Sequence, residues 1–278
     1  MFASTLILCS AFFHAFWNAV LKHEKGSPKI LLLATSVSII ASLGYAVFAD
    51  QLMWGSGRSI YFGIASGLFE GLYFLMLTQL FRSGNLGIQY ATMRGGAMVL
   101  VWIVSLLIGR EKITFDAGLG SLLILSGIFL TQAAGLKLRR KEFERSILSA
   151  VCIAGYHIMY DQALEGGIKP SALYAISLIV ALPFLISVVW REKEKALKFT
   201  GRQILIASGV GTLMALSFIL FLTGLLQTGP GYGIGLRNTS IVYALLFGYF
   251  LKERLTTTQL GGVCLIFLGA AILSLRNL

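Results

Sequence analysis

Apolar runs of about 20 residues follow one another along almost the whole chain, separated by short charged or turn-forming connections. An α-helix of this length crosses the hydrocarbon core of a bilayer and pairs its backbone groups within itself, as a spanning segment must. The runs lie at residues 2–21, 29–49, 59–81, 86–109, 115–136, 146–164, 170–190, 203–226, 231–251 and 256–275. The pattern predicts an all-α integral membrane protein with ten transmembrane helices.

The composition excludes the main soluble alternatives. Of the 278 residues, 56% are hydrophobic and only 13% are charged, whereas a soluble domain carries about 25% charged residues. The net charge of +11 does not indicate a nucleic-acid partner, because the basic residues stand between apolar runs. Cys9, Cys152 and Cys264 lie in separate runs without the spacing of metal ligands, so we expect no metal site and no cofactor.

The distribution of basic residues predicts an orientation in the membrane. The connections after the odd-numbered runs carry most of the Lys and Arg residues, and the densest group lies at 137–145. The positive-inside rule then places this linker in the cytoplasm and both termini outside. Residues 1–10 lack the basic segment of a signal peptide, so we expect the first run to be kept as a helix.

The basic linker 137–145 divides the chain into two similar halves, residues 1–136 and 146–278. Matching positions are His14 and His157, Trp17 and Tyr160, Asn18 and Asp161, and Arg94 and Arg237. Each half holds five runs, and because five is odd, the second half enters the membrane inverted relative to the first. The sequence therefore predicts two inverted five-helix repeats, an arrangement common in transporters.

Glu111 and Thr114 stand at the start of the fifth run, and Glu253 and Thr256 at the start of the tenth, each pair followed by spaced glycines. This pattern resembles the repeat signature of the EamA family of the drug/metabolite transporter superfamily. The segments around His14-Ala-Phe-Trp17-Asn18, Arg82 to Arg94 and Leu236-Arg237 are similar to a bacterial EamA subgroup of permeases, some linked with phosphonate utilisation. The resemblance implies a multi-pass transporter of the bacterial inner membrane. We further expect a monomer or a weak homodimer.

Four charged side chains lie inside the apolar runs, away from the outermost residues of each run: Glu70, Arg94, Asp161 and Arg237. A charge at mid-membrane costs about 2.5 to 3.5 kcal/mol on insertion scales, so it persists where it faces a cavity or a partner. One interpretation is structural ion pairs, with Glu70 held by Arg94 across the short connection between their runs. The sequence favours the other, in which Arg94 and Arg237 converge on one midplane cavity and bind an acid group.

Further candidate site residues share helix faces with one another. His14 and Asn18 are four residues apart, as are His157 and Asp161, so each pair projects from one side of its helix. The predicted substrate-binding set is Arg94, Arg237, Tyr90, His14, Asn18, His157, Asp161, Trp17 and Tyr160. Protons are a candidate co-substrate, with Glu70, Asp161, His14 and His157 as the groups that could carry them.

The glycine-rich stretch 229–235 superficially suggests a phosphate loop, but no strand precedes it and no Lys-Ser follows it. We expect it instead to loosen the start of the ninth run and to leave free backbone groups beside Arg237.

These features together predict a secondary transporter that works by alternating access. The arginines suit an acid group, while Glu70, Asp161 and the aromatic residues suit an amine, so a zwitterion such as an amino acid or aminophosphonate satisfies both. The alternatives are a lipid or lipid-carrier flippase and a quaternary-amine or drug exporter of the same superfamily. The chain has no HExxH motif and no Ser/His/Asp set on matching faces, so we expect no enzyme and no catalytic residues.

Overall fold

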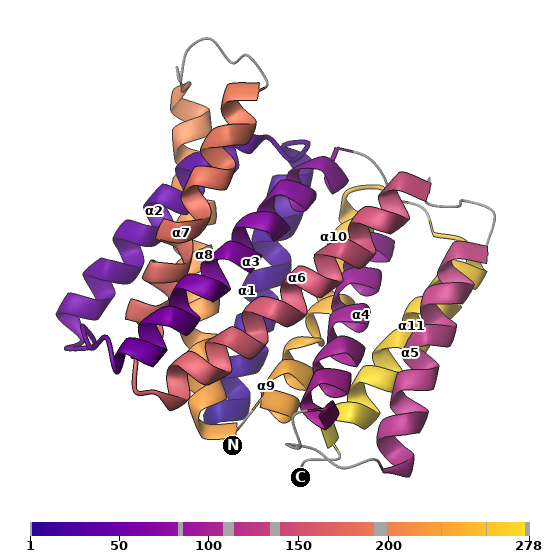
Figure 1. Ribbon diagram of the computed structural model, residues 1–278. Coiled ribbons are helices and arrows are strands. Elements are labelled where there is room, and N and C mark those ends of the chain that lie inside the picture. Colours follow the sequence, from indigo (N-terminus) through magenta and orange to yellow (C-terminus); the bar gives the residue numbers. More distant parts are fainter. Residues whose placement is uncertain are drawn as a thin grey trace.

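The computed structural model describes residues 2–82, 86–107, 114–133, 140–191, 199–228, 230–253 and 255–275, and this part of the chain is helical apart from short connections. Its helices are α1 (Phe2–His23), α2 (Pro28–Phe48), α3 (Gly57–Leu80), α4 (Leu86–Leu107), α5 (Phe115–Ala133), α6 (Arg140–Glu165), α7 (Pro170–Arg191), α8 (Gly201–Thr228), α9 (Pro230–Arg237), α10 (Ser240–Phe250) and α11 (Thr257–Leu275). The helices lie side by side in one bundle, with α2 and α7 at one end and α5 and α11 at the other (Figure 1).

Five helices, α1, α2, α3, α7 and α8, are long and apolar enough to cross a membrane. The described parts of α4, α5 and α11 contain shorter apolar stretches at 88–104, 118–130 and 257–272. The expectation of a helical membrane protein is confirmed at this level.

The connection between α1 and α2 shows how the sequence ends one helix and begins the next. Gly26 has a positive φ of 63°, and its N–H donates to Leu21 O at 2.8 Å, which closes the last turn of α1. Ser27 caps α2 by accepting from Ile30 N at 3.4 Å, and Pro28 occupies the first helical position. A Cβ at position 26 would overlap Thr78 O, so this turn also packs closely against α3.

The ninth apolar run is not one helix, as the sequence predicted, but two. The chain turns at Asn238 and Thr239, where Thr239 N donates to Leu236 O at 3.1 Å and Ile241 N donates to Asn238 O at 2.9 Å. The Thr239 hydroxyl also donates to Leu236 O at 2.8 Å and so competes with the regular helix ladder. The break therefore follows Arg237 instead of preceding it.

The prediction of a loosened start for this run is also wrong. The chain from Pro230 to Arg237 forms helix α9 despite its glycines. A helix satisfies the backbone of such a stretch internally, and this requirement outweighs the weak helix propensity of glycine inside a membrane.

Helix α6 begins at Arg140, six residues before the predicted run, so residues 140–145 of the basic linker form its first turns. Arg140 Nε donates to Glu144 Oε1 at 2.8 Å, an ion pair spaced four residues apart that supports this helical start. Residues 137–139 lie outside the described part of the chain.

The helices pack extensively across the two halves of the sequence. Helix α1 packs on α8, α3 on α6 and α7, α2 on α8, and α5 on α11. Gly67 of α3 lies so close to α7 that a Cβ would overlap Ser177 O, and Gly211 of α8 lies equally close to Ala34 O of α2. In both places a small residue lets two backbones approach each other.

The α5–α11 pair repeats this geometry with its own glycines. A Cβ at Gly127 of α5 would overlap Gly262 O of α11, and a Cβ at Gly269 of α11 would overlap Gly120 O of α5. The glycines that the sequence places at matching distances in the two halves thus contact each other reciprocally.

Candidate functional site

Two arginines from different halves of the chain meet at one histidine in the centre of the bundle. Arg94 projects from α4 and Arg237 from the last turn of α9, and both are buried, with 2% and 0% of their surface exposed. Arg94 Nη2 contacts His14 Nε2, and Arg237 Nη2 lies 3.1 Å from His14 Nδ1. The structure thus brings both guanidinium groups to His14, while their predicted convergence on a cavity that binds an acid group stays a prediction.

Aromatic rings surround the guanidinium groups. The Arg237 guanidinium carbon lies 4.2 Å from the ring centroid of Phe218 and 4.0 Å from that of Phe221, both on α8. Arg94 lies 5.6 Å from the centroid of Tyr90, which is one helical turn away on α4. Such cation–π contacts hold a desolvated guanidinium without neutralising its charge, so it still attracts an anion.

Glu70 forms a second pole of the cluster. Its Oε2 accepts hydrogen bonds from Tyr160 Oη of α6 at 2.7 Å and from Ser177 Oγ of α7 at 2.6 Å, while its Oε1 has no hydrogen-bond partner among the described residues. The alternative in which Glu70 pairs with Arg94 is wrong, because Arg94 turns to His14 and hydroxyl groups of the second half satisfy the carboxyl group.

His157 occupies the position in α6 that matches His14 in α1, but its contacts differ. Its Nδ1 lies 2.7 Å from Ile153 O, and since a carbonyl only accepts, Nδ1 carries the ring proton. Its Nε2 is then an acceptor and has no partner among the described residues. The ring stacks on Tyr156 at 4.4 Å and meets Phe221 edge-on at 5.3 Å.

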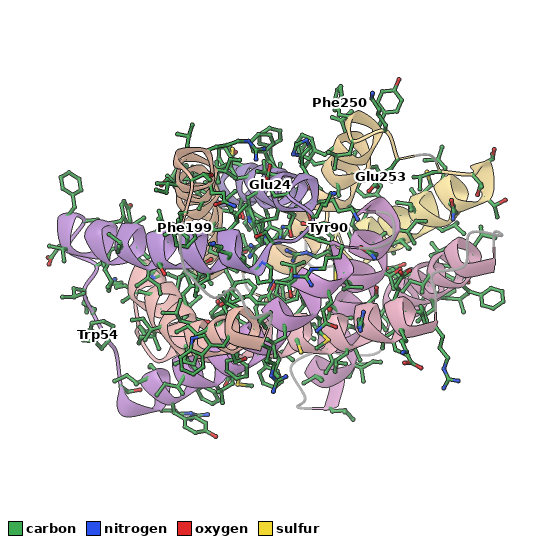
Figure 2. All side chains as sticks on the ribbon, turned by 90° about the horizontal axis from the view of Figure 1, so that it is seen from above. Glu24, Trp54, Tyr90, Phe199, Phe250 and Glu253 are labelled. Atoms are coloured by element: carbon green, nitrogen blue, oxygen red, sulfur yellow. The ribbon has the colours of Figure 1, made fainter. Side chains whose placement is uncertain are left out.

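An aromatic network joins the two poles into one cluster. Tyr156 lies 5.5 Å from Tyr160 and 6.3 Å from Phe218, measured between ring centroids, and Phe218 lies 5.5 Å from His14. Trp17 meets His14 edge-on at 5.0 Å. Seen from above in Figure 2, Tyr90 lies in the interior, whereas Trp54 and Phe250 lie at the edge.

Two of the predicted site residues differ from the rest of the cluster, Asn18 in its contact and Asp161 in its exposure. The Asn18 side chain donates from Nδ2 to His14 O at 2.7 Å and is therefore tied to its own helix. Asp161 is partly exposed near the end of α6, unlike the buried His157 one turn earlier. Of the four charged residues within the runs, the buried ones are Glu70, Arg94 and Arg237, so their formal charges leave an excess of one positive charge.

Several buried polar atoms in the cluster have no hydrogen-bond partner among the described residues. They include the donors Nε and Nη1 of Arg237 and Nε1 of Trp17, the acceptors Oε1 of Glu70, Nε2 of His157 and Oδ1 of Asn18, and the hydroxyl groups of Tyr90 and Tyr156, which can donate or accept. Buried polar atoms in folded proteins nearly always have hydrogen-bond partners. The described cluster therefore offers donors to an acid group and acceptors to an ammonium group.

The predicted set lacks four residues that complete the cluster: Tyr156, Ser177, Phe218 and Phe221. They stand within uniformly apolar runs, where no local pattern separates a wall residue from a packing residue. The only local signal is the three-residue spacing of the two phenylalanines, which places them on one face of α8.

Comparisons with known proteins bear on the whole chain. Residues 146–275 match the family model described as EamA-like transporter family. No curated protein matches the sequence significantly. Among 27 matching chains of solved structures, one described as "Crystal structure of protein" has a TM-score of 0.67 and 15% sequence identity, over 97% of this chain and 98% of that chain. At this identity the likeness shows the fold alone. The family match covers residues 146–275, just under half of the chain, and shows that the second predicted half is similar to the EamA-like transporters of the drug/metabolite superfamily.

Proposed function

We propose that the protein is a secondary transporter that moves a small zwitterionic or anionic metabolite, of the amino acid or organophosphonate type, across the bacterial inner membrane. The observation that carries the proposal is the pair of buried guanidinium groups on His14, with Glu70 in the same aromatic cluster. A guanidinium binds carboxylate or phosphonate oxygens in a bidentate fashion, and the excess positive charge favours an anion. The free acceptors on Glu70 and His157 suit an ammonium group.

We also propose that the two halves, 1–136 and 146–278, are inverted repeats that rock around this cluster to give alternating access. The reciprocal packing of Gly67 and Gly211, and of the glycines in α5 and α11, supports a two-fold relation between the halves. Arg94 and Arg237 occupy equivalent positions in such repeats, and a shared site at the repeat interface can open to either side. In this arrangement both termini lie outside and the basic linker lies in the cytoplasm.

Lipid flipping is less well supported. A flippase needs a laterally open groove that binds a charged headgroup. Two grooves on the described surface are lined by Leu32, Ser36, Leu182, Ile186, Val189 and Trp190, and by Leu245, Gly248, Tyr249, Glu253, Leu255 and Leu260. Neither contains a basic side chain, whereas the buried arginines lie in the centre of the bundle.

A binding and exchange assay on the purified full-length protein tests the proposed function. Thermal stability is measured with three zwitterions, L-serine, L-threonine and 2-aminoethylphosphonate, and with two analogues that carry one charge, lactate and ethanolamine. Counterflow of the same compounds is measured in liposomes. We expect zwitterions to stabilise the protein most and to exchange, lactate to act more weakly, and ethanolamine to have no effect. Binding of ethanolamine without binding of the zwitterions would contradict the proposal and favour the amine-exporter alternative.

A further inference from the structure

The contacts of His14 cannot all be hydrogen bonds at the same time. Both of its ring nitrogens face guanidinium nitrogens, Nε2 facing Arg94 and Nδ1 facing Arg237. A guanidinium only donates, and a neutral imidazole has one N–H and one lone pair. One arginine can therefore donate to the ring nitrogen that has a lone pair. The other arginine faces the ring N–H, which is also a donor, so no hydrogen bond forms between them.

An acid group bound beside His14 relieves this conflict. Its oxygens accept from the displaced guanidinium and from the ring N–H, so that every donor has an acceptor. Its negative charge also offsets the two guanidinium charges. When the imidazole also carries a second N–H, the arginine that had donated to the ring loses its acceptor there and donates to another lone pair of the acid group instead. Without the anion, this state would place three positive charges together in a site of low dielectric.

Other groups around the ring do not supply this compensating charge. Tyr90 of α4 lies 6.2 Å from the His14 ring, measured between ring centroids, and His157 of α6 could add only a positive charge by protonation. Helix α8 presents the ring of Phe218, and its charged residue Arg202 lies at the far end of the helix, paired with Glu24. Helix α10, which also packs on α1, contains no charged residue.

We propose that His14 takes up one proton when an acid group binds to Arg94 and Arg237, from the side of the membrane to which the site is then open. His14 releases this proton together with the solute on the other side. The inference rests on the proposed transport function and deepens it, because it assigns the coupling ion and its carrier. By linkage, the bound anion and the bound proton then increase each other's affinity equally.

His157 is the matched control for this role. Its Nδ1–H is fixed by Ile153 O, and its Nε2 faces aromatic rings without an acceptor for a second proton. The two histidines thus hold equivalent sequence positions, but only His14 lies between two guanidinium groups.

Proton uptake on binding of L-serine tests the proposal. Calorimetric titrations of the wild-type protein in two buffers of different ionisation enthalpy give the number of protons bound per solute. Between about pH 5.5 and pH 7.5 neither charged group of L-serine titrates. We expect close to one proton per L-serine in this range and an affinity that rises up to about tenfold per unit decrease in pH. H14Q is expected to bind L-serine without proton uptake, and H157Q to keep the uptake whatever its affinity.

The outcomes separate this inference from the proposed function. If no zwitterion of the panel binds, the transport proposal fails and the coupling role falls with it. If L-serine binds to the wild type without proton uptake, or if H14Q still takes up the proton, the role of His14 is overturned while the transporter proposal stands. If H14Q lacks a cooperative thermal transition, H14N replaces it. If neither H14Q nor H14N folds, proton uptake is compared between the wild type and E70Q. Uptake that is the same in both proteins supports the role of His14, and uptake that is lost in E70Q overturns it.

Discussion

The formal charges of Arg94, Arg237 and Glu70 leave the buried cluster with an excess of one positive charge, and the proposed preference for an acid group rests on this excess. A site with balanced charges in fixed ion pairs would only lock the helices together. Here the guanidinium groups face a histidine and aromatic rings, so their charge stays available to an acid group.

Replacing Arg237 with lysine keeps the charge but removes the planar fork that binds two oxygens at once. We expect R237K to lower the affinity for L-serine by about tenfold or more, which corresponds to about 1.4 kcal/mol. Isothermal titration of the purified variant measures this loss, and its thermal midpoint shows whether the fold is kept. Affinity within twofold of the wild type would contradict a bidentate role for Arg237.

Glu70 is expected to determine the requirement for an ammonium group. In E70Q the amide oxygen can still accept from Tyr160 and Ser177, so the fold is expected to be retained. Binding of L-serine should fall by about tenfold or more because a charge-assisted contact is lost, whereas binding of lactate should change little. The ratio of the two affinities is the readout, and an equal loss for both solutes contradicts this assignment.

The close approach of neighbouring helices depends on glycines in α3 and α8. A Cβ at Gly211 would overlap Ala34 O, whereas Gly209 on the same helix has nothing within 4 Å of such a Cβ. We expect G211A to destabilise the protein by about 1 to 3 kcal/mol, as overpacking does. G209A should leave stability unchanged or raise it by up to about 1 kcal/mol, because alanine favours a helix over glycine. Thermal unfolding in detergent compares them, and equal midpoints would show that α2 and α8 are not in this contact.

The proposed two-fold relation between the halves makes a second prediction for these helices. Gly67 approaches α7 as Gly211 approaches α2, so G67A should lower the midpoint by an amount similar to G211A. A stable G67A beside an unstable G211A would argue against equivalent packing in the two halves.

An ion pair ties the connection after α1 to the start of α8. Arg202 donates to Glu24 from Nη2 at 2.5 Å and from Nη1 at 3.2 Å, with 64% and 12% of the two side chains exposed. Partial burial acts to raise the pKa of Glu24, but the hydrogen bonds and charge of Arg202 and His23 outweigh it, so the pKa lies below its ordinary value.

The stability that this pair contributes is therefore present above the ordinary glutamate pKa and is lost as the pH falls through the lower pKa of the folded state. We expect E24Q to cost at most about 1 kcal/mol at pH 7, because Arg202 is largely exposed and solvent screens the pair. The difference in thermal midpoint between wild type and E24Q should vanish under acidic conditions. A difference that grows with acidity contradicts this account.

For the whole molecule, the apolar runs predicted the helical bundle well because the membrane requires each spanning segment to pair its backbone internally. The runs did not predict the turn at Asn238 and Thr239, which depends on a local side-chain hydrogen bond inside an apolar stretch. From the matching positions of His14 and His157 one could predict that both lie in one cluster. One could not predict that the two histidines contact different groups. Those partners follow from packing between helices distant in sequence, as the contact of Glu70 with Ser177 also shows.

The central claim is that arginines from both halves hold the same acid group, and a double-mutant cycle on L-serine affinity tests it most directly. R94Q, R237Q and the double variant are titrated with L-serine beside the wild type, with thermal midpoints recorded for each. If both guanidinium groups bind one carboxylate, either single substitution already disrupts its binding. The affinity of the double variant for L-serine should then be only slightly lower than that of the single variant with the lower affinity. Losses that add in free energy within about 0.5 kcal/mol would mean that the two arginines act at separate places and would contradict the shared site.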